Sequence, residues 1–321
     1  MVILVQKLGR SLKFHHRLDN HSHPANNHDS EEALMASFQA FQSEVSKTLG
    51  QILAEANKLG SSFLSLEWIQ QCLEKLPMIE RAFAKLAVDL DYPMIKWEQS
   101  ASDAYLKYSL NVMELLNKIS SSVSHLSQGR VGLAHGLGLV IANSPSLALK
   151  NHLQGIKPKD PGNGFKVEGV KTVQPDEEAE AKVICQKESI IHEASGIMIG
   201  SALRLLGIMI SGLCSDVKPY LEARNLAGKL QEPSLQSLEF LLDQEIKQKK
   251  NTVKEVKEVN DAAAELVAEI GRGKGDPAAE KLGRKLEVLE KILERIAQQT
   301  DRMFSEVLAA RSKILDTIRH K

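Results

Sequence analysis

The sequence is poor in aromatic residues and in cysteine. Phenylalanine, tyrosine and tryptophan together make up 4% of its 321 residues. β-Sheets and base-stacking nucleic-acid surfaces rely on these side chains, so both are disfavoured. The three cysteines, Cys72, Cys185 and Cys214, are far apart and form no C-x-x-C pair. Neither a disulfide framework nor a zinc cage is therefore indicated, which fits a reducing compartment.

The chain also lacks an excess of charge of either sign. Lysine plus arginine and aspartate plus glutamate number 41 each, so no global field draws the protein to nucleic acid, and we expect no nucleic-acid partner. The motifs of common enzymes are missing as well: there is no H-E-x-x-H, nucleophile elbow, Rossmann turn or kinase signature. We therefore expect a protein that is not an enzyme, with no catalytic residue, no cofactor and no metal ligand.

What the chain does have is helical periodicity. Apolar residues make up 43% of the sequence, which is ample for a packed core, and they recur at spacings of three and four. The fold class that we predict is all-α: an elongated multi-helix bundle with a long C-terminal antiparallel helical hairpin and a central glycine-rich apolar helix. The expected helices cover residues 29–58, 65–90, 95–126, 128–143, 145–153, 190–214, 235–270 and 277–318.

Local signals predict where these helices begin and end. Asp29 opens a capping box for the first helix, and Ser65 is expected to cap the second. Pro77 lies inside the second apolar pattern, so a kink or a break is expected just before it. Residues 155–175 hold three prolines and four glycines without helical period, which predicts a mobile surface loop. Residues 216–233 are expected to be a connector.

The last helix shows a sustained three-four alternation of apolar residues from Leu282 to Ile314. Nearly five heptads of this kind are compatible with a coiled coil between chains. A long hairpin within one chain explains the same pattern without a partner. The sequence leaves both interpretations open.

The stretch Ile190 to Cys214 is nearly apolar on every helical face and is about as long as a membrane span. Its eight isoleucines and leucines after Ser195 favour insertion by roughly 2.4 to 4.8 kcal/mol, whereas Arg204 opposes it by about 2.5 to 3.5 kcal/mol. The helix is therefore either the centre of a soluble or peripheral bundle or a membrane-inserted segment. If it is buried in protein, Arg204 needs several carbonyls or a carboxylate, which we expect from the first or last helices.

Small residues in this central helix leave room for close helix packing. The candidates for such contacts are Gly196, Gly200, Arg204 and Gly207. Gly196 and Gly200 have the G-x-x-x-G spacing that membrane helix pairs use, although soluble bundles also place small residues at tight crossings.

The N-terminus is basic and amphipathic. Residues 1–18 combine apolar side chains with Lys7, Arg10, Lys13 and Arg17 and contain no acidic residue. Such a segment can lie on an anionic membrane surface, or it can direct a protein to an organelle. We therefore divide the chain into an N-terminal region, residues 1–28, that ends in a His-rich linker, and a single helical-bundle domain, residues 29–321, interrupted by the loop at 155–175.

Five short motifs carry a resemblance. They are V-x-x-x-x-K-L-G-R at Val2 to Arg10, L-S-L-E-W at Leu64 to Trp68, K-W-E at Lys96 to Glu98, Y-L-x-x-S at Tyr105 to Ser109, and L-S-Q-G at Leu126 to Gly129. Together they resemble the plant BYPASS family, in particular its BYPASS-like branch. The signature residues are Trp68, Lys96, Trp97, Glu98, Tyr105, Leu106, Ser109, Gln128 and Gly129. Their helical spacing fits core and helix-crossing positions better than a ligand site.

The resemblance implies an all-helical plant protein that acts in growth and developmental signalling, with stress signalling as an extension. We expect a non-enzymatic, membrane-associated helical adaptor whose partners are other proteins, bound through helical surfaces, and a membrane surface. The expected location is the cytosol and the cytoplasmic side of the endoplasmic reticulum or plasma membrane, with the plastid as the alternative. The alternative function is a small-molecule binding protein or enzyme with a pocket around the glycine-rich central helices.

Overall fold

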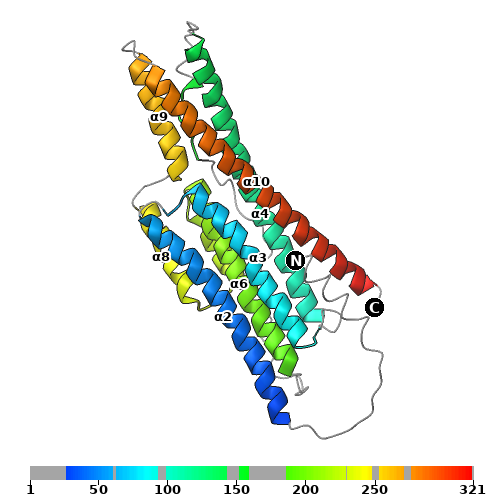
Figure 1. Ribbon diagram of the computed structural model, residues 1–321. Helices are drawn as coiled ribbons and strands as arrows, with labels where there is room; N and C mark the ends of the chain where they lie inside the picture. The colour runs from blue at the N-terminus through cyan, green and yellow to red at the C-terminus, as the bar shows by residue number, and fades with distance from the viewer. Residues whose placement is uncertain are drawn as a thin grey trace.

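The computed structural model describes residues 27–60, 63–92, 99–142, 152–158, 186–228, 230–247, 253–270 and 276–319. These residues form eight helices and no strand, arranged as an elongated bundle (Figure 1). The predicted all-α fold is therefore confirmed. In chain order the helices are α2 (Asn27–Leu59), α3 (Leu66–Asp89), α4 (Gln99–Ile141), α6 (Gln186–Cys214), α7 (Lys218–Ala227), α8 (Pro233–Lys247), α9 (Lys254–Ile270) and α10 (Asp276–Arg319).

Two long antiparallel helices, α4 and α10, form the frame of the bundle (Figure 1). Near one end, Arg311 of α10 contacts Ser109 of α4 at 2.9 Å. Nearer the other end, Arg130 of α4 and Glu290 of α10 form an ion pair at 2.9 Å. Helices α2, α3 and α6 lie along one half of this frame, and α9 packs against the first half of α10.

The apolar seam of α10 is buried inside the chain itself. All ten of its positions are at most 7% exposed, because α3, α4 and α9 cover them. They are Leu282, Leu286, Leu289, Leu293, Ile296, Thr300, Met303, Val307, Ala310 and Ile314. Of the two interpretations that the seam left open, packing within one chain is the one that the structure shows. The predicted C-terminal hairpin consists of α9 and α10, whose antiparallel register is marked by ion pairs from Lys281 to Glu265 and from Lys285 to Glu258.

The prediction of one continuous helix over residues 235–270 is wrong. The chain forms two helices there, α8 and α9, which pack against different neighbours: α8 against α2 and α6, and α9 against α10. Val253, just before α9, is 3% exposed, and the next amide, Lys254 N, donates to the Leu64 carbonyl at 3.4 Å. The change of partner explains why one continuous helix does not form.

Two further helix boundaries differ from the prediction. The helices expected over 95–126 and 128–143 are one helix, α4, whose glycine-rich second half stays helical because α10 and the segment 152–158 pack against it. Helix α3 continues through Pro77, so of the kink or break that we expected there, the break does not occur. The buried residues Leu73, Leu76 and Ile79 form one continuous apolar face on both sides of the proline.

Other ends were predicted more closely. The Ser65 side chain accepts from Trp68 N at 3.1 Å, which confirms the predicted cap of α3. Helix α2 begins at Asn27, two residues before Asp29. The connector expected after residue 216 contains a ten-residue helix, α7, that sequence analysis missed. The short helix predicted over 145–153 lies almost entirely outside the described residues.

Helix α6 is the centre of the bundle. Every residue from Gly200 to Cys214 is buried, as expected for a helix that is apolar on all faces. It is long and apolar enough to cross a membrane, but 89% of its most apolar 18-residue stretch is buried inside the protein. Its neighbours are α2, α3, α4, α7 and α8. In this structure the central apolar helix therefore packs in the interior of the bundle.

Candidate functional site

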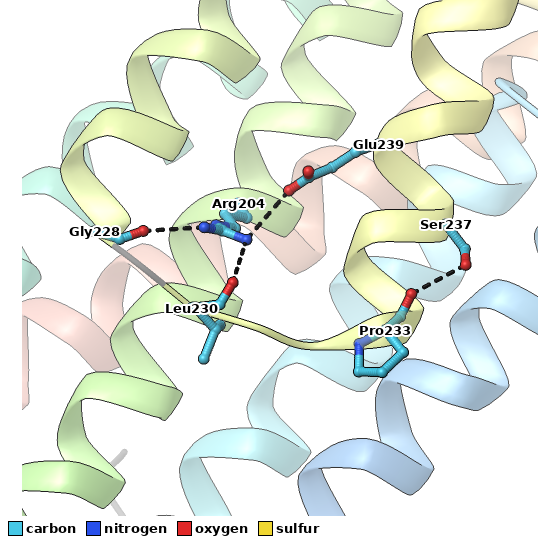
Figure 2. Close-up of polar contacts among 6 residues, drawn as sticks. All are labelled: Arg204, Gly228, Leu230, Pro233, Ser237 and Glu239. Atoms are coloured by element: carbon cyan, nitrogen blue, oxygen red, sulfur yellow. Dashed lines mark hydrogen bonds and ion pairs between the residues drawn. The ribbon is translucent and has the colours of Figure 1, made fainter.

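A buried guanidinium lies where α6, α7 and α8 meet (Figure 2). Arg204 of α6 is 5% exposed. Its Nη1 donates to the Leu230 carbonyl at 3.0 Å and to Glu239 Oε1 at 3.4 Å, and its Nη2 donates to the Gly228 carbonyl at 3.0 Å. The positive charge thus has two carbonyls and one carboxylate as partners, which offsets much of the cost of burying it.

The way in which the backbone turns at the C-terminal end of α7 explains these contacts. Gly228 follows the last residue of α7 and has φ of 69°, so the chain turns there and leaves carbonyl groups without helical partners. Arg204 donates to two of those carbonyls and thereby attaches the linker between α7 and α8 to the central helix. We expected a carboxylate from the first or last helices; that expectation is wrong, because the carboxylate is Glu239 of α8. Nearby, burial and the Glu239 carboxylate raise the pKa of Tyr220.

The glycines of α6 make unequal contacts. A Cβ placed on Gly207 would lie 2.6 Å from the Ala223 Cβ, and one on Gly200 would lie 3.0 Å from a Leu230 methyl group. A Cβ on Gly196 would have no atom within 4 Å. The tight crossing is therefore at Gly207, where α7 runs back along α6, and the G-x-x-x-G pair does not form a contact surface as a unit in the described bundle.

The signature residue Trp68 is a core residue. It is fully buried, its indole Nε1 donates to the Ile52 carbonyl at 3.3 Å, and its ring packs edge-to-face on Phe63 with centroids 5.3 Å apart. The carboxylate of Glu255, from α9, accepts from Leu66 N at 2.8 Å and from Glu67 N at 3.2 Å. The L-S-L-E-W motif is thus the start of α3, capped by Ser65 from within and by Glu255 from across the bundle.

Two signature residues of the Y-L-x-x-S motif, Leu106 and Ser109, accept hydrogen bonds from an arginine of α10. Arg311 Nη1 donates to the Leu106 carbonyl and, at 2.9 Å, to the Ser109 hydroxyl. Ser109 Oγ itself donates to the Leu106 carbonyl at 2.8 Å. Sequence analysis missed Arg311; the available signal was a cation directly after the buried Ala310 of the seam. The motif fixes the C-terminal part of α10 to α4.

The tyrosines of the same motif enclose a buried acid. Glu80 of α3 is 6% exposed and accepts from the Tyr108 hydroxyl at 3.1 Å. Burial raises the pKa of Glu80, and burial together with the Glu80 charge raises the pKa values of Tyr105 and Tyr108. The two phenol rings pack edge-to-face with centroids 5.8 Å apart. The hydrogen bond between Glu80 and Tyr108 joins α3 to α4. The raised pKa values favour the neutral form of all three side chains.

The glycine of the L-S-Q-G motif allows the segment 152–158 to pack closely on α4. A Cβ on Gly129 would lie 2.8 Å from the Ile156 side chain, so a larger residue there would displace Ile156. The backbone N–H of Ile156 donates to Asn260 Oδ1 at 2.7 Å, and its carbonyl accepts from Asn260 Nδ2 at 2.9 Å. The first residues of the predicted loop are therefore anchored to α4 and α9. Gln128 is exposed, and residues 159–175 lie outside the described part of the chain.

Several predicted site residues also lie outside the described part. These are Lys7, Arg10, Lys13, Arg17, Lys96, Trp97 and Glu98. Within the described ranges, no three His, Cys, Asp or Glu side chains are grouped so that they could hold a metal ion. Cys72 and Cys214 are buried, and burial raises the pKa of the Cys72 thiol.

A cavity of about 420 Å³ lies between α2 and α3, on the outside of the bundle. It is lined by residues between Ser37 and Glu44 and between Met78 and Asp89, and none of its lining residues belongs to α6. The alternative function requires a pocket at the central glycines. Gly200, Gly207 and Gly212 of α6 instead face Leu230, Ala223 and Leu64 side chains at close range.

Comparison with known proteins gives partial matches to plant proteins. Protein BPS1, chloroplastic, from Arabidopsis thaliana is 34% identical over 85 residues, which are 26% of this chain and 24% of that relative. UPF0496 protein 4 from Oryza sativa, in both subspecies indica and japonica, is 29% identical over 84 residues, 26% of this chain and 18% of the relative. No protein-family profile and no solved structure matches the chain. The resemblance to BYPASS-related plant proteins is confirmed over about a quarter of the chain.

Proposed function

From the resemblance to BYPASS-related plant proteins, we propose that this chain is a non-enzymatic plant regulator of growth and development, with stress signalling as an extension. We propose further that it acts as a helical adaptor at a membrane surface. The observation that carries the proposal is the sequence similarity to the Arabidopsis and rice proteins. The similarity covers 26% of this chain, 24% of the Arabidopsis relative and 18% of the rice relative. The activity of the whole protein is therefore part of the proposal.

The roles of three polar side chains that join helices, the buried Arg204 and the half-buried Glu255 and Arg311, support an adaptor. Arg204, Glu255 and Arg311 each join two or more helices through hydrogen bonds to the backbone. Polar side chains that fix a scaffold in this way are used for architecture, which leaves the outer helical surfaces for partners. The proposed partners are other proteins that bind through such surfaces.

The composition of residues 1–18 supports the membrane surface. Four cations and no acid lie among apolar residues there, and such a segment gains affinity from apolar burial and from attraction to anionic lipids. The proposed location is the cytosol and the cytoplasmic face of the endoplasmic reticulum or plasma membrane. The plastid is the second candidate, favoured by the word chloroplastic in the name of the Arabidopsis relative.

Sedimentation with lipid vesicles tests the membrane role. The purified full chain should sediment with anionic vesicles at low salt, stay in solution with neutral vesicles, and lose binding as salt screens the attraction. Reversing Lys7, Arg10 and Lys13 to glutamate should abolish sedimentation. The matched control reverses three exposed cations on the folded bundle, Lys107, Lys257 and Arg295. Equal binding by both triple variants would refute the role of residues 1–18.

Complementation of a plant line that lacks this protein tests the regulatory and non-enzymatic parts. The wild-type chain should restore growth, and so should a chain with Cys185→Ser and His192→Ala. These two residues are seven positions, or about two helical turns, apart and are the nearest thing to a Cys-His pair in the sequence. Loss of rescue by that variant, at normal protein level, would contradict a non-enzymatic role. A fluorescent fusion in the same plants distinguishes the cytoplasmic location from the plastid.

A further inference from the structure

The cavity between α2 and α3 is an open groove with an apolar floor. Phe41 and Leu86 form the floor, and Met78 is half-buried at one end. The walls carry the small residues Ala40 and Ala82. Small residues on the two walls let the backbone of another helix come close, as at tight helix crossings, without displacing a large side chain.

The groove has the length of a short helix. From Met78 to Asp89 the α3 wall rises eleven residues, or about 16 Å, which is about three helical turns. The α2 wall runs antiparallel to it, with Phe41 packed edge-to-face on Phe83 at 6.2 Å between centroids. An amphipathic helix that places apolar side chains at i, i+3 or i+4, and i+7 needs this length of groove.

The charges on the rim favour an acidic occupant. Arg81 and Lys85 are exposed, lie one turn apart on α3, and have no salt-bridge partner among the described residues. On the opposite wall, Glu44 is paired with Lys47 at 3.7 Å. Asp89, one turn beyond Lys85, is the remaining carboxylate of the rim. The rim therefore presents two adjacent unpaired cations against one unpaired acid.

From the small-residue walls, the length and this charge pattern, we infer that the groove between α2 and α3 binds an amphipathic helix of another protein, with acidic residues flanking its apolar stripe. The inference rests on the proposed adaptor function and names the surface and the chemistry of the partner. In the complex, acidic residues of the partner lie along Arg81 and Lys85, and its apolar residues cover Met78, Ala40 and Ala82.

Binding of synthetic helices to the full chain tests this inference. Two fluorescent peptides of about 15 residues share one apolar stripe at helical spacing and carry either glutamate or lysine at the flanking positions. Measured by fluorescence anisotropy, the acidic peptide should bind with at least about tenfold higher affinity than the basic one. The difference should shrink as salt is added.

Variants of the groove distinguish it from other surfaces. Ala82→Trp fills the groove and should reduce the affinity for the acidic peptide at least about tenfold, whereas Ala54→Trp, at an exposed position of α2 outside the groove, should leave it unchanged. Lys85→Glu should shift the preference toward the basic peptide, and Arg295→Glu on α10 should not. Lys85 is exposed, so Lys85→Glu keeps the test valid even if Ala82→Trp lowers the thermal midpoint.

The outcomes separate this inference from the proposed function. Absence of saturable peptide binding, or binding that ignores both Ala82→Trp and Lys85→Glu, overturns the inference even if wild-type protein sediments with anionic vesicles. If Lys85→Glu and Ala82→Trp instead abolish vesicle binding while the peptides do not compete, the groove takes lipid and the inference is wrong. If the peptides bind as expected and vesicles do not, the groove stands and the proposed membrane role fails.

Discussion

Gly207 of α6 faces Ala223 of α7 so closely that a Cβ on the glycine would lie 2.6 Å from the Ala223 Cβ. Gly207→Ala should therefore destabilise the fold by about 1 to 3 kcal/mol, because the two helices must move apart. Chemical denaturation followed by circular dichroism measures the change. Gly196→Ala is the matched control: its Cβ would meet open space, so it should raise stability by about 0.5 to 1 kcal/mol. Equal effects at the two positions would refute the tight crossing.

The Arg204 contacts predict a large loss of stability on substitution. Arg204→Leu leaves the Glu239 carboxylate, which is 12% exposed, and two linker carbonyls without their donor. The expected cost is about 3 to 5 kcal/mol, measured as a lower thermal midpoint. A second substitution, Glu239→Leu, should recover part of that loss, because it removes the unpaired acid. A gain in the membrane fraction of Arg204→Leu without loss of stability would instead show that α6 inserts in a bilayer.

The Arg311 contacts predict that the C-terminal part of α10 depends on one side chain. Arg311→Ala removes charge-assisted hydrogen bonds to the Leu106 carbonyl and the Ser109 hydroxyl, and should cost about 1.5 to 3 kcal/mol. Amide hydrogen exchange should accelerate over the last turns of α10. Arg302→Ala on the same helix is the control, since Arg302 is 76% exposed and pairs only along the surface with Glu306. Similar exchange in both variants would contradict the prediction.

Burial of Glu80 predicts a pH-dependent stability. Its pKa is raised in the folded protein, so the folded state binds the proton more tightly than the unfolded state does. Stability from this group is fully present below its unfolded pKa, about 4.3, and is lost as pH rises through the folded pKa. Glu80→Gln keeps an acceptor for Tyr108 and cannot ionise, so its advantage over the wild type should grow from pH 4 upward.

Denaturant midpoints of wild type and Glu80→Gln across the pH range provide the measurement. The difference should be smallest at the acid end and increase with pH by at most about 1.4 kcal/mol per pH unit. A constant offset between wild type and Glu80→Gln would rule out coupling to this proton.

Sequence reasoning predicted the helices best where the signal is local. Ser65 lies three residues before the amide that it caps, and the seam from Leu282 to Ile314 shows its period directly. Helix α7 was missed because ten residues with a proline near the start and polar residues throughout have a weak apolar period. Helix α4 was predicted as two helices, over 95–126 and 128–143, whereas it is continuous and its Gly129 provides space for Ile156.

The site was harder to predict because its partners are far apart in the sequence. The need of Arg204 for partners follows from its apolar surroundings, but nothing local indicates Glu239 or the turn at Gly228. Glu255 and Asn260 are surface-type residues in an amphipathic helix, and their bonds to Leu66 and Ile156 depend on how α9 docks. Such pairings are set by tertiary packing, which the pattern of one segment does not contain.

The cap that Glu255 places on α3 has a consequence for synthesis of the chain. Its acceptor atoms lie 189 residues after Leu66, so at about 5 to 20 residues per second the ribosome adds them about 10 to 40 seconds later. During that interval the first turn of α3 has only Ser65 to satisfy its amide groups. The N-terminal helices therefore emerge before the group that completes them. We conclude that the first turn of α3 receives its second cap only after α9 has left the exit tunnel, whatever the earlier helices have formed by then.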